Sequence, residues 1–182
     1  MPQGIVVIKI GTGVLTREKD GTLDEASLVR LVTSVSELVA SGVPSVMVSS
    51  GAVGAGVSAL KLGAYPEDIV SRQACAAVGQ TRLMHAYENL FQKFGLNVAQ
   101  ILLTAADLDH ERPSNHVMDT LHRLLEEKNI VPIINENDTV AVKELRVGDN
   151  DMLSARVARL LGARLLVMFS TVNGLQRDDG SL

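Results

Sequence analysis

Short runs of aliphatic residues alternate along this chain with longer segments in which apolar residues recur every three or four positions. A short run that is apolar throughout is typical of a strand buried on both faces, and the three-to-four period is typical of an amphipathic helix. Strands that alternate with helices are parallel, because each helix carries the chain back across the sheet. The alternation therefore predicts an α/β fold, a three-layer α/β/α sandwich with a mostly parallel central sheet.

Local signals place the elements and their boundaries. Pro66, followed by two acidic residues, predicts the first turn of a long helix, and Gly79 inside that helix predicts a kink or a close-packing point. Pro132 argues against a fully paired interior position, and residues 139–147 alternate loosely, as in a hairpin or flap. No helix is expected to open over 11–16. We expect strands over 4–10, 43–49, 97–104, 130–134 and 165–169, and helices over 24–42, 50–60, 66–94, 115–128 and 149–161.

Composition narrows the class of protein. The chain has 182 residues, of which 46% are hydrophobic and 3% aromatic, so one domain with an aliphatic core is expected. The formal net charge of −4, without a long run of either sign, argues against a general nucleic-acid binder. No stretch reaches the roughly 18 apolar residues of a membrane span. With a single cysteine, Cys75, and no signal-like start, a cytoplasmic protein is expected.

Polar residues follow the predicted strands at their carboxyl ends, which is where open parallel sheets bind ligands. Lys9 ends the first strand beside Gly11 and Gly13, whose N–H groups could approach a polyphosphate closely. Segment 49–56 offers hydroxyls and a helix N-terminus, the components of an anion site. The alternatives are a lysine that snorkels from an edge strand and an ordinary capping serine before a close-packed helix. Neither a Walker loop nor a complete dinucleotide fingerprint is present.

Two dense polar clusters, 135–138 and 148–151, complete the pattern. Asn side chains can hold an amino or carboxylate group, and Asp can accept from an ammonium or help to place a metal ion. Either cluster alone could be ordinary turn chemistry. Together with the lysine and the anion site they predict a small-molecule site. The histidines show no zinc-ligand spacing, and no residue is predicted as a metal ligand. Four polar residues of the long helix could line a pocket, although a solvated face is the expectation for them: Arg72, Gln73, Gln80 and Arg82.

Six motifs, in order over nearly the whole chain, resemble the glutamate 5-kinases of the amino acid kinase superfamily. They are Lys9-x-Gly11-Thr12, Ser49-Ser50-Gly51-Ala52, Ala77-Val78-Gly79-Gln80, Leu102-Leu103-Thr104, Asn135-Glu136-Asn137-Asp138 and Val147-Gly148-Asp149-Asn150-Asp151. The resemblance implies phosphorylation of the γ-carboxylate of L-glutamate, the first step of proline biosynthesis, with ATP and Mg²⁺. It also implies that residues 1–182 are the glutamate- and phosphate-binding portion of the kinase domain, without its C-terminal nucleotide-binding half or a PUA domain.

The resemblance also implies roles for individual residues. Lys9 is expected to be catalytic, while Ser50, Gly51, Asp138 and Asn150 are expected to bind glutamate. ATP is expected to contact Lys9, Gly11, Thr12, Gly13, Ser170 and Thr171, and Asn135, Asn137, Asp149 and Asp151 are auxiliary polar residues. Thr171 stands where the family has the acid of a Thr-Asp pair.

Further expectations from the resemblance are a homo-oligomer and feedback inhibition by proline near the flap. Two alternatives remain: an amino-acid-binding module without catalysis, and a kinase for another acidic metabolite.

Overall fold

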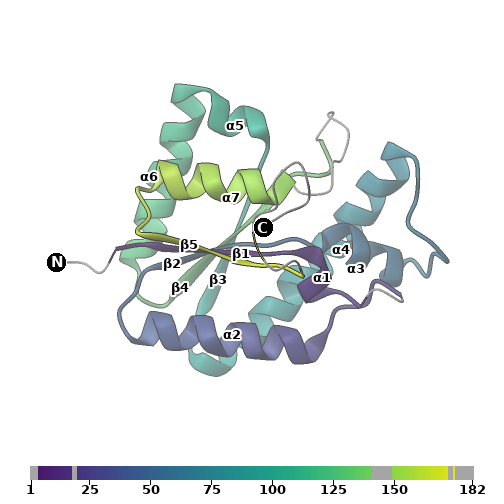
Figure 1. The fold of residues 1–182 in the computed structure, drawn as a ribbon, viewed down its shortest axis with the longest axis horizontal. Coiled ribbons are helices and arrows are strands. Elements are labelled where there is room, and N and C mark those ends of the chain that lie inside the picture. The colour runs from purple at the N-terminus through teal and green to yellow at the C-terminus, as the bar shows by residue number, and fades with distance from the viewer. Residues whose placement is uncertain (1–3, 18–19, 141–148, 172–173, 175–182) are drawn as a thin grey trace.

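The computed structural model describes residues 4–17, 20–140, 149–171 and 174. Its five-stranded sheet has the order β3-β4-β2-β1-β5, and all of its described pairings are parallel. Helices α2 and α4 cover one face of this sheet and α6 and α7 cover the other (Figure 1). The predicted three-layer α/β/α sandwich is therefore confirmed.

The elements lie close to the predicted ranges. The strands are β1 (Val6–Ile10), β2 (Ser45–Val48), β3 (Asn97–Leu103), β4 (Ile130–Glu136) and β5 (Leu165–Phe169). The helices are α1 (Thr12–Leu15), α2 (Glu25–Ala40), α3 (Ala52–Ala59), α4 (Ile69–Phe91), the 3₁₀ turn η1 (Gln92–Phe94), α5 (Ala105–Asp109), α6 (Glu111–Glu126) and α7 (Asp149–Leu160).

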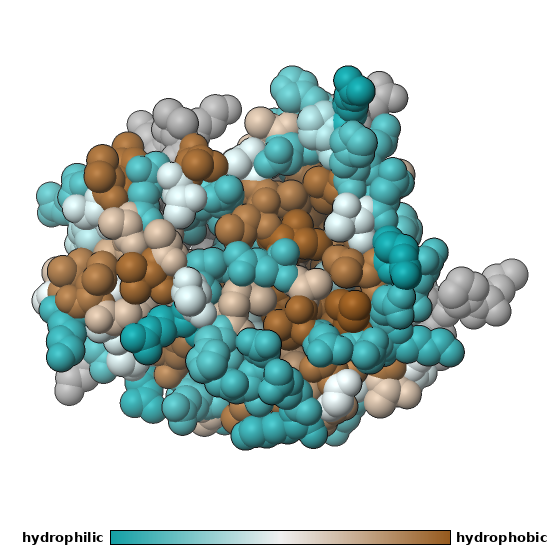
Figure 2. Space-filling view, turned by 180° about the vertical axis from the view of Figure 1, so that it is seen from behind, coloured by the Kyte–Doolittle hydropathy of each residue, from teal (hydrophilic) through white to brown (hydrophobic). Residues whose placement is uncertain are grey.

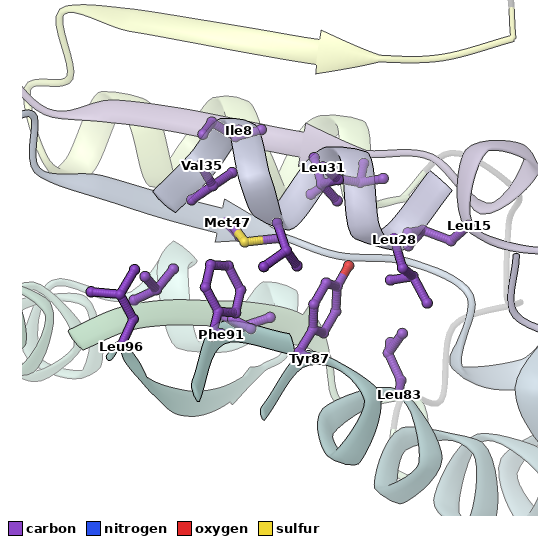
Figure 3. Packing of buried hydrophobic residues seen from close by; sticks show 14 of the residues in the cluster. Ile8, Leu15, Leu28, Leu31, Val35, Met47, Leu83, Tyr87, Phe91 and Leu96 are labelled. Carbon is purple, nitrogen blue, oxygen red and sulfur yellow. The ribbon is translucent and has the colours of Figure 1, made fainter. Parts of the chain in front are cut away.

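The sheet separates two apolar cores. Successive strand side chains point to opposite faces, so Ile8 and Met47 pack with α2 and α4 while Val7 packs with α6 and α7. Tyr87 and Phe91 project from α4 toward Met47 in the first core, with their ring centroids 6.3 Å apart (Figure 3). All five residues of β1 are buried, as expected for a strand covered on both faces.

Several predicted helix boundaries are wrong. Helix α4 begins at Ile69, after Pro66, because the Asp68 carboxylate caps it by accepting a hydrogen bond of 2.8 Å from the Ser71 backbone N–H. One helical turn, α1, opens directly after Gly11, where no helix was expected. Helix α6 begins at Glu111, before the predicted start at 115.

Helix α5 was missed altogether. It begins after Thr104, which the prediction placed in a strand. The Thr104 hydroxyl and backbone N–H both donate to the Asp107 carboxylate at 2.7 Å. Such a capping box satisfies N–H groups that a helix start otherwise leaves unpaired.

Pro132 lies in an interior strand, and its effect is confined to one side. It pairs in register with Ala99 of the edge strand β3, whereas the pairing of β4 with β2 begins at Ile133, opposite Met47. A proline cannot donate to a neighbouring strand, so the ladder toward β2 starts just after it. The predicted flap lies mostly outside the described residues, and only the turn at 138–140 is described there.

Gly79 is the close-packing point that its place inside the helix predicts. A Cβ atom there would lie 1.8 Å from the Ala52 carbonyl oxygen, and one at Gly56 would lie 1.9 Å from the Cys75 carbonyl oxygen. Helices α3 and α4 therefore cross with their backbones in contact. This contact brings the middle of α4 next to the segment that follows β2.

The surface carries exposed apolar residues. In the edge strand β5, Leu165, Met168 and Phe169 are exposed, and Val70 of α4 is 74% exposed. Figure 2 shows hydrophobic residues gathered into extended areas on the face opposite to that of Figure 1. Exposed apolar residues that gather in this way are typical of contact surfaces. Among the described helices, none has the length and apolar character needed to cross a bilayer.

Candidate active site

Four segments that carry predicted site residues meet at the carboxyl end of the sheet. Lys9 lies near the end of β1, Ser49 and Ser50 follow β2, Asn135 lies near the end of β4, and α7 begins there with 149–151. Hydrogen bonds and an ion pair join all four segments. The topology therefore brings together residues that are far apart in the sequence.

Lys9 is a buried cation that forms an ion pair. Its residue is 6% exposed, and its ammonium pairs with the carboxylate of Asp151, whose side chain is 50% exposed. Strand β1 lies between β2 and β5, so the alternative of a lysine snorkelling from an edge strand is wrong. A buried ammonium requires a counter-charge, and here that charge comes from the first turn of α7, at the boundary with solvent.

The glycine loop after β1 runs along the end of β5. The Gly11 N–H donates to the Phe169 carbonyl oxygen at 2.9 Å. A Cβ at Gly11 would lie 3.4 Å from Lys9 Nζ, and one at Gly13 would lie 2.9 Å from Thr171 Cγ2. Thr12, Gly13, Ser170 and Thr171 are exposed. The residues predicted to contact ATP therefore form one exposed cluster beside the lysine ammonium.

Gly51 makes the turn from β2 into α3. Its φ of +94° lies in the left-handed region, which a side chain disfavours. Ser50 precedes this turn and is 8% exposed. The turn therefore holds the Ser50 hydroxyl at the carboxyl end of the sheet.

Asn150 connects the segments through its side-chain amide. Its two Nδ2 hydrogens are shared among three acceptors: the Ser49 carbonyl oxygen at 3.0 Å, Ser50 Oγ at 2.9 Å and Asn135 Oδ1 at 3.1 Å. Its Oδ1 is buried and has no hydrogen-bond partner among the residues that the structure describes. A buried acceptor without a partner is costly, so a ligand N–H or ammonium at this position would satisfy it.

Ser49 is anchored by a hydrogen bond to Tyr87, a residue of the apolar core. Its hydroxyl shares a hydrogen bond of 2.9 Å with the Tyr87 hydroxyl, and both residues are fully buried. Burial raises the pKa of Tyr87, because the phenolate would lose its hydration. The Tyr87 hydroxyl therefore stays protonated at neutral pH and remains available for this bond.

Gln80 belongs to the site, although the sequence analysis preferred a solvated face for it to a place in a pocket. It is half-buried, and its Oε1 accepts a hydrogen bond of 2.8 Å from Asn135 Nδ2, so the expectation of a solvated face is wrong for it. Arg82 is exposed, as expected, while Arg72 Nε donates to the Pro66 carbonyl oxygen at 2.7 Å. The signal that could have found Gln80 is Gly79, because a close-packing glycine places its neighbour near the end of β2.

The remaining predicted residues lie at the turn after β4 and at the start of α7. Asn137 has a turn role, since its Oδ1 accepts from Thr139 Oγ1 at 2.6 Å and its N–H donates to the Leu103 carbonyl oxygen at 2.7 Å. Asp138 follows it and is half-buried. Asp149 is the first residue of α7. Asn137 therefore shapes the turn that contains Asp138.

The sequence pattern of the amino acid kinase family matches residues 4–182. This chain belongs to the amino acid kinase family. Three glutamate 5-kinases show the similarity within it. The one from Geobacter sp. (strain M21) is 50% identical over 174 residues, which are 96% of this chain and 46% of the relative. The one from Clostridium acetobutylicum is 44% identical over 170 residues, 93% of this chain and 63% of the relative.

The third glutamate 5-kinase, from Symbiobacterium thermophilum, is 45% identical over 177 residues, 97% of this chain and 67% of the relative. The chain thus spans between about half and two thirds of the length of these relatives.

The residues around Lys9 have the chemistry needed to bind a nucleotide. An ammonium beside a loop in which Thr12 and Gly13 are exposed fits the oxygens of a phosphate chain. Among the described residues there is no group of three or more His, Cys, Asp or Glu side chains that could hold a metal. Mg²⁺ usually keeps several waters and binds phosphates with only one or two carboxylates. The residues present therefore fit a nucleotide that brings its own Mg²⁺, with Asp151 as the nearest described carboxylate to Lys9.

Proposed function

We propose that this chain forms the glutamate- and phosphate-binding part of an ATP-dependent glutamate 5-kinase, which makes L-glutamyl 5-phosphate in proline biosynthesis. The main support is one observation. The buried ammonium of Lys9, paired with Asp151, lies at the same end of the sheet as Asn150, whose buried Oδ1 has no partner among the described residues. A cation for a phosphoryl group and an acceptor for an ammonium are the two things that an amino acid kinase needs.

The amino-acid end of the substrate binds at the start of α7. Asn150 Oδ1 accepts from the α-ammonium of glutamate, and Asp138 supplies a second acceptor from the turn after β4. The Ser50 hydroxyl, held by Asn150 Nδ2 at 2.9 Å, is available to the substrate carboxylate. This arrangement leaves the side-chain carboxylate facing Lys9.

The transfer itself needs little covalent help from the protein. A γ-carboxylate oxygen of glutamate attacks the γ-phosphorus of ATP, the bond to the bridging β–γ oxygen breaks, and ADP leaves with that electron pair. The carboxylate is already ionised at neutral pH, so no general base is required. Lys9 and the exposed backbone at Thr12 and Gly13 stabilise charge on the moving phosphoryl group. Mg²⁺, when bound, neutralises phosphate charge.

The remaining features of the proposal rest on the resemblance. L-Proline competes with glutamate near the flap, and the protein is a cytoplasmic homo-oligomer. A second candidate, an amino-acid-binding module without catalysis, is favoured by one residue: the exposed Thr171, which replaces the acid of the family's Thr-Asp pair.

A thermal-shift titration tests the amino-acid half. Because a ligand that binds only the folded state raises the melting temperature, L-glutamate should raise that of wild type and not that of Asn150→Ala. L-Aspartate and N-acetylglutamate are the competing acids, and L-proline is the expected inhibitor. A cooperative transition that glutamate leaves unmoved contradicts the proposal, and a larger shift with another acid supports a different substrate.

Trapping with hydroxylamine tests the transfer, because an acyl phosphate reacts to a hydroxamate. Hydroxamate formed from glutamate, ATP and Mg²⁺ would exclude the non-catalytic candidate. A glutamate shift without hydroxamate would favour it for this chain.

A further inference from the structure

Gln80 is linked to the ligand-facing amide of Asn150 through one intermediate residue. Gln80 Oε1 accepts from Asn135 Nδ2 at 2.8 Å, and Asn135 Oδ1 accepts from Asn150 Nδ2 at 3.1 Å. Asn135 is 1% exposed and Gln80 is half-buried. The three side chains come from α4, β4 and α7, so the link joins three separate elements across the end of the sheet.

Backbone groups determine which way each amide in this link points. The Glu136 N–H donates to Asn135 Oδ1 at 2.9 Å, and an N–H can only donate, so Asn135 must present its oxygen there and its nitrogen to Gln80. Asn150 Nδ2 faces the Ser49 carbonyl oxygen at 3.0 Å, and a carbonyl can only accept. These backbone partners therefore fix which side-chain atom is the oxygen and which is the nitrogen in both Asn135 and Asn150.

This orientation of the Asn135 amide requires an acceptor at position 80. Asn135 Nδ2 is a donor in a buried environment, and a buried donor without a partner costs more than the bond contributes when made. Without the acceptor, the Asn135 amide would gain by turning toward another partner, and Asn150 would then lose one of the acceptors that hold its Nδ2. The unpaired Asn150 Oδ1 would lose its defined position as a result.

The helix crossing explains why Gln80 can reach Asn135. Gly79 lies so close to α3 that a Cβ there would be 1.8 Å from the Ala52 carbonyl oxygen and 2.4 Å from the Gly56 nitrogen. Helix α3 starts immediately after Ser50 and Gly51, so α4 is drawn against the same end of the sheet. The residue after Gly79 therefore enters the site although its helix also carries exposed polar residues.

We propose that Gln80 is a positioning residue for amino-acid binding: its carbonyl oxygen holds Asn135, which holds Asn150 so that Asn150 Oδ1 receives the ammonium of the substrate. The proposal rests on the proposed function for the identity of the substrate. It adds that α4, which contributes no residue to the phosphate loop, controls affinity for the amino acid through one acceptor.

Two substitutions at position 80 separate the acceptor from the packing. Gln80→Met keeps the length of the side chain and removes the acceptor, whereas Gln80→Glu keeps an acceptor in the same place. Arg82→Gln, at an exposed position of the same helix, is the matched control. The readout is the Kd of L-glutamate for the 182-residue chain by titration calorimetry, together with the melting temperature of each free protein.

We expect Gln80→Met to weaken glutamate binding by about 5- to 150-fold, the range for one buried donor left unpaired. Gln80→Glu should stay within about 3-fold of wild type, as should Arg82→Gln. Wild-type affinity in Gln80→Met, or equal loss in Gln80→Met and Gln80→Glu, overturns the proposal. Equal loss would mean that the shape or charge of the side chain matters and not its acceptor.

The side-chain amide resonances of Asn135 and Asn150 provide a readout that needs no ligand. Gln80→Glu should shift both pairs of resonances, because the new acceptor polarises the whole link, while Arg82→Gln should shift neither. An Asn150 resonance that does not move in Gln80→Glu overturns the link even if Gln80→Met fails to fold. If wild type binds no glutamate but the Asn150 resonance moves, the proposed substrate is wrong and the positioning link stands.

Discussion

The ammonium of Lys9, buried in the second strand from the edge of the sheet, is paired with the half-exposed carboxylate of Asp151 in the first turn of α7. The pair joins strand β1 to the helix that carries Asn150. Its two members differ in burial, with side chains 8% and 50% exposed. Removing the charge of Asp151 should therefore change the stability of the fold by a different amount from removing the charge of Lys9.

Asp151→Asn should destabilise the fold more than Lys9→Met. The first leaves a buried cation without a counter-charge and should lower the free energy of unfolding by about 1–3 kcal/mol. The second leaves a carboxylate that water can reach and should change it by less than about 1 kcal/mol. Urea denaturation measures both. Asp109→Asn, which breaks the exposed pair with Arg156, is the control and should cost under about 1 kcal/mol. A greater loss in Lys9→Met would contradict this reading of the pair.

Gly79→Ala should destabilise the protein although alanine favours helices. The added Cβ would meet the Ala52 carbonyl oxygen, so α3 and α4 must separate, at a cost of about 2–4 kcal/mol in the free energy of unfolding. Gly63→Ala is the matched control, because a Cβ at Gly63 would meet no atom within 4 Å and the φ of this glycine is not left-handed. That variant should unfold like wild type or be slightly more stable. Equal stability of the two variants would show that the helices can move apart freely.

Tyr87→Phe should remove a buried hydrogen bond and change the response to alkaline pH. Loss of the bond to Ser49 should lower the free energy of unfolding by about 1–2 kcal/mol at pH 7. Because burial raises the pKa of Tyr87 above its ordinary value of 10.0, the unfolded chain ionises first and wild type should lose stability as pH rises above about 10. The difference between wild type and Tyr87→Phe should therefore shrink between pH 9 and about 11. A difference that stays constant over that range would argue against a buried neutral hydroxyl.

Asn150→Asp should be worse for the fold than Asn150→Ala. The carboxylate would place an oxygen opposite the Ser49 carbonyl oxygen and Asn135 Oδ1, which now accept hydrogen bonds from Nδ2. Acceptors brought together in a buried position repel, so we expect Asn150→Asp to lose about 1–3 kcal/mol more than Asn150→Ala in chemical denaturation. A more stable aspartate variant would indicate that the amide points the other way.

Sequence reasoning located the strands and most helices because the apolar period is a local property. It was less successful at boundaries, which depend on single side chains: the Asp68 carboxylate starts α4, and Asp107 caps a helix that no apolar period indicates. Pro132 was recognised as a limit on pairing. Only the strand order shows that the limit applies toward β2 and not toward β3.

The candidate site was likewise predicted only in part. The polar clusters at the strand ends were visible in the sequence, because residues that follow apolar strands of a parallel sheet must gather at one edge. Gln80 was recognised only as a possible pocket-lining residue, and a solvated face was preferred for it, because its helix has a mixed surface and its partner Asn135 lies in a distant strand.

By itself, the sequence determined the α/β layering and the edge of the sheet at which the predicted site residues gather, since both follow from the order and period of apolar segments. Tertiary structure alone decided that Lys9 is interior and paired with Asp151, that Gly79 brings α4 onto α3, and that Asn150 keeps an oxygen without a partner among the described residues. Each of these depends on distances between residues remote in the chain, which close packing sets to within a fraction of an ångström and local patterns do not encode.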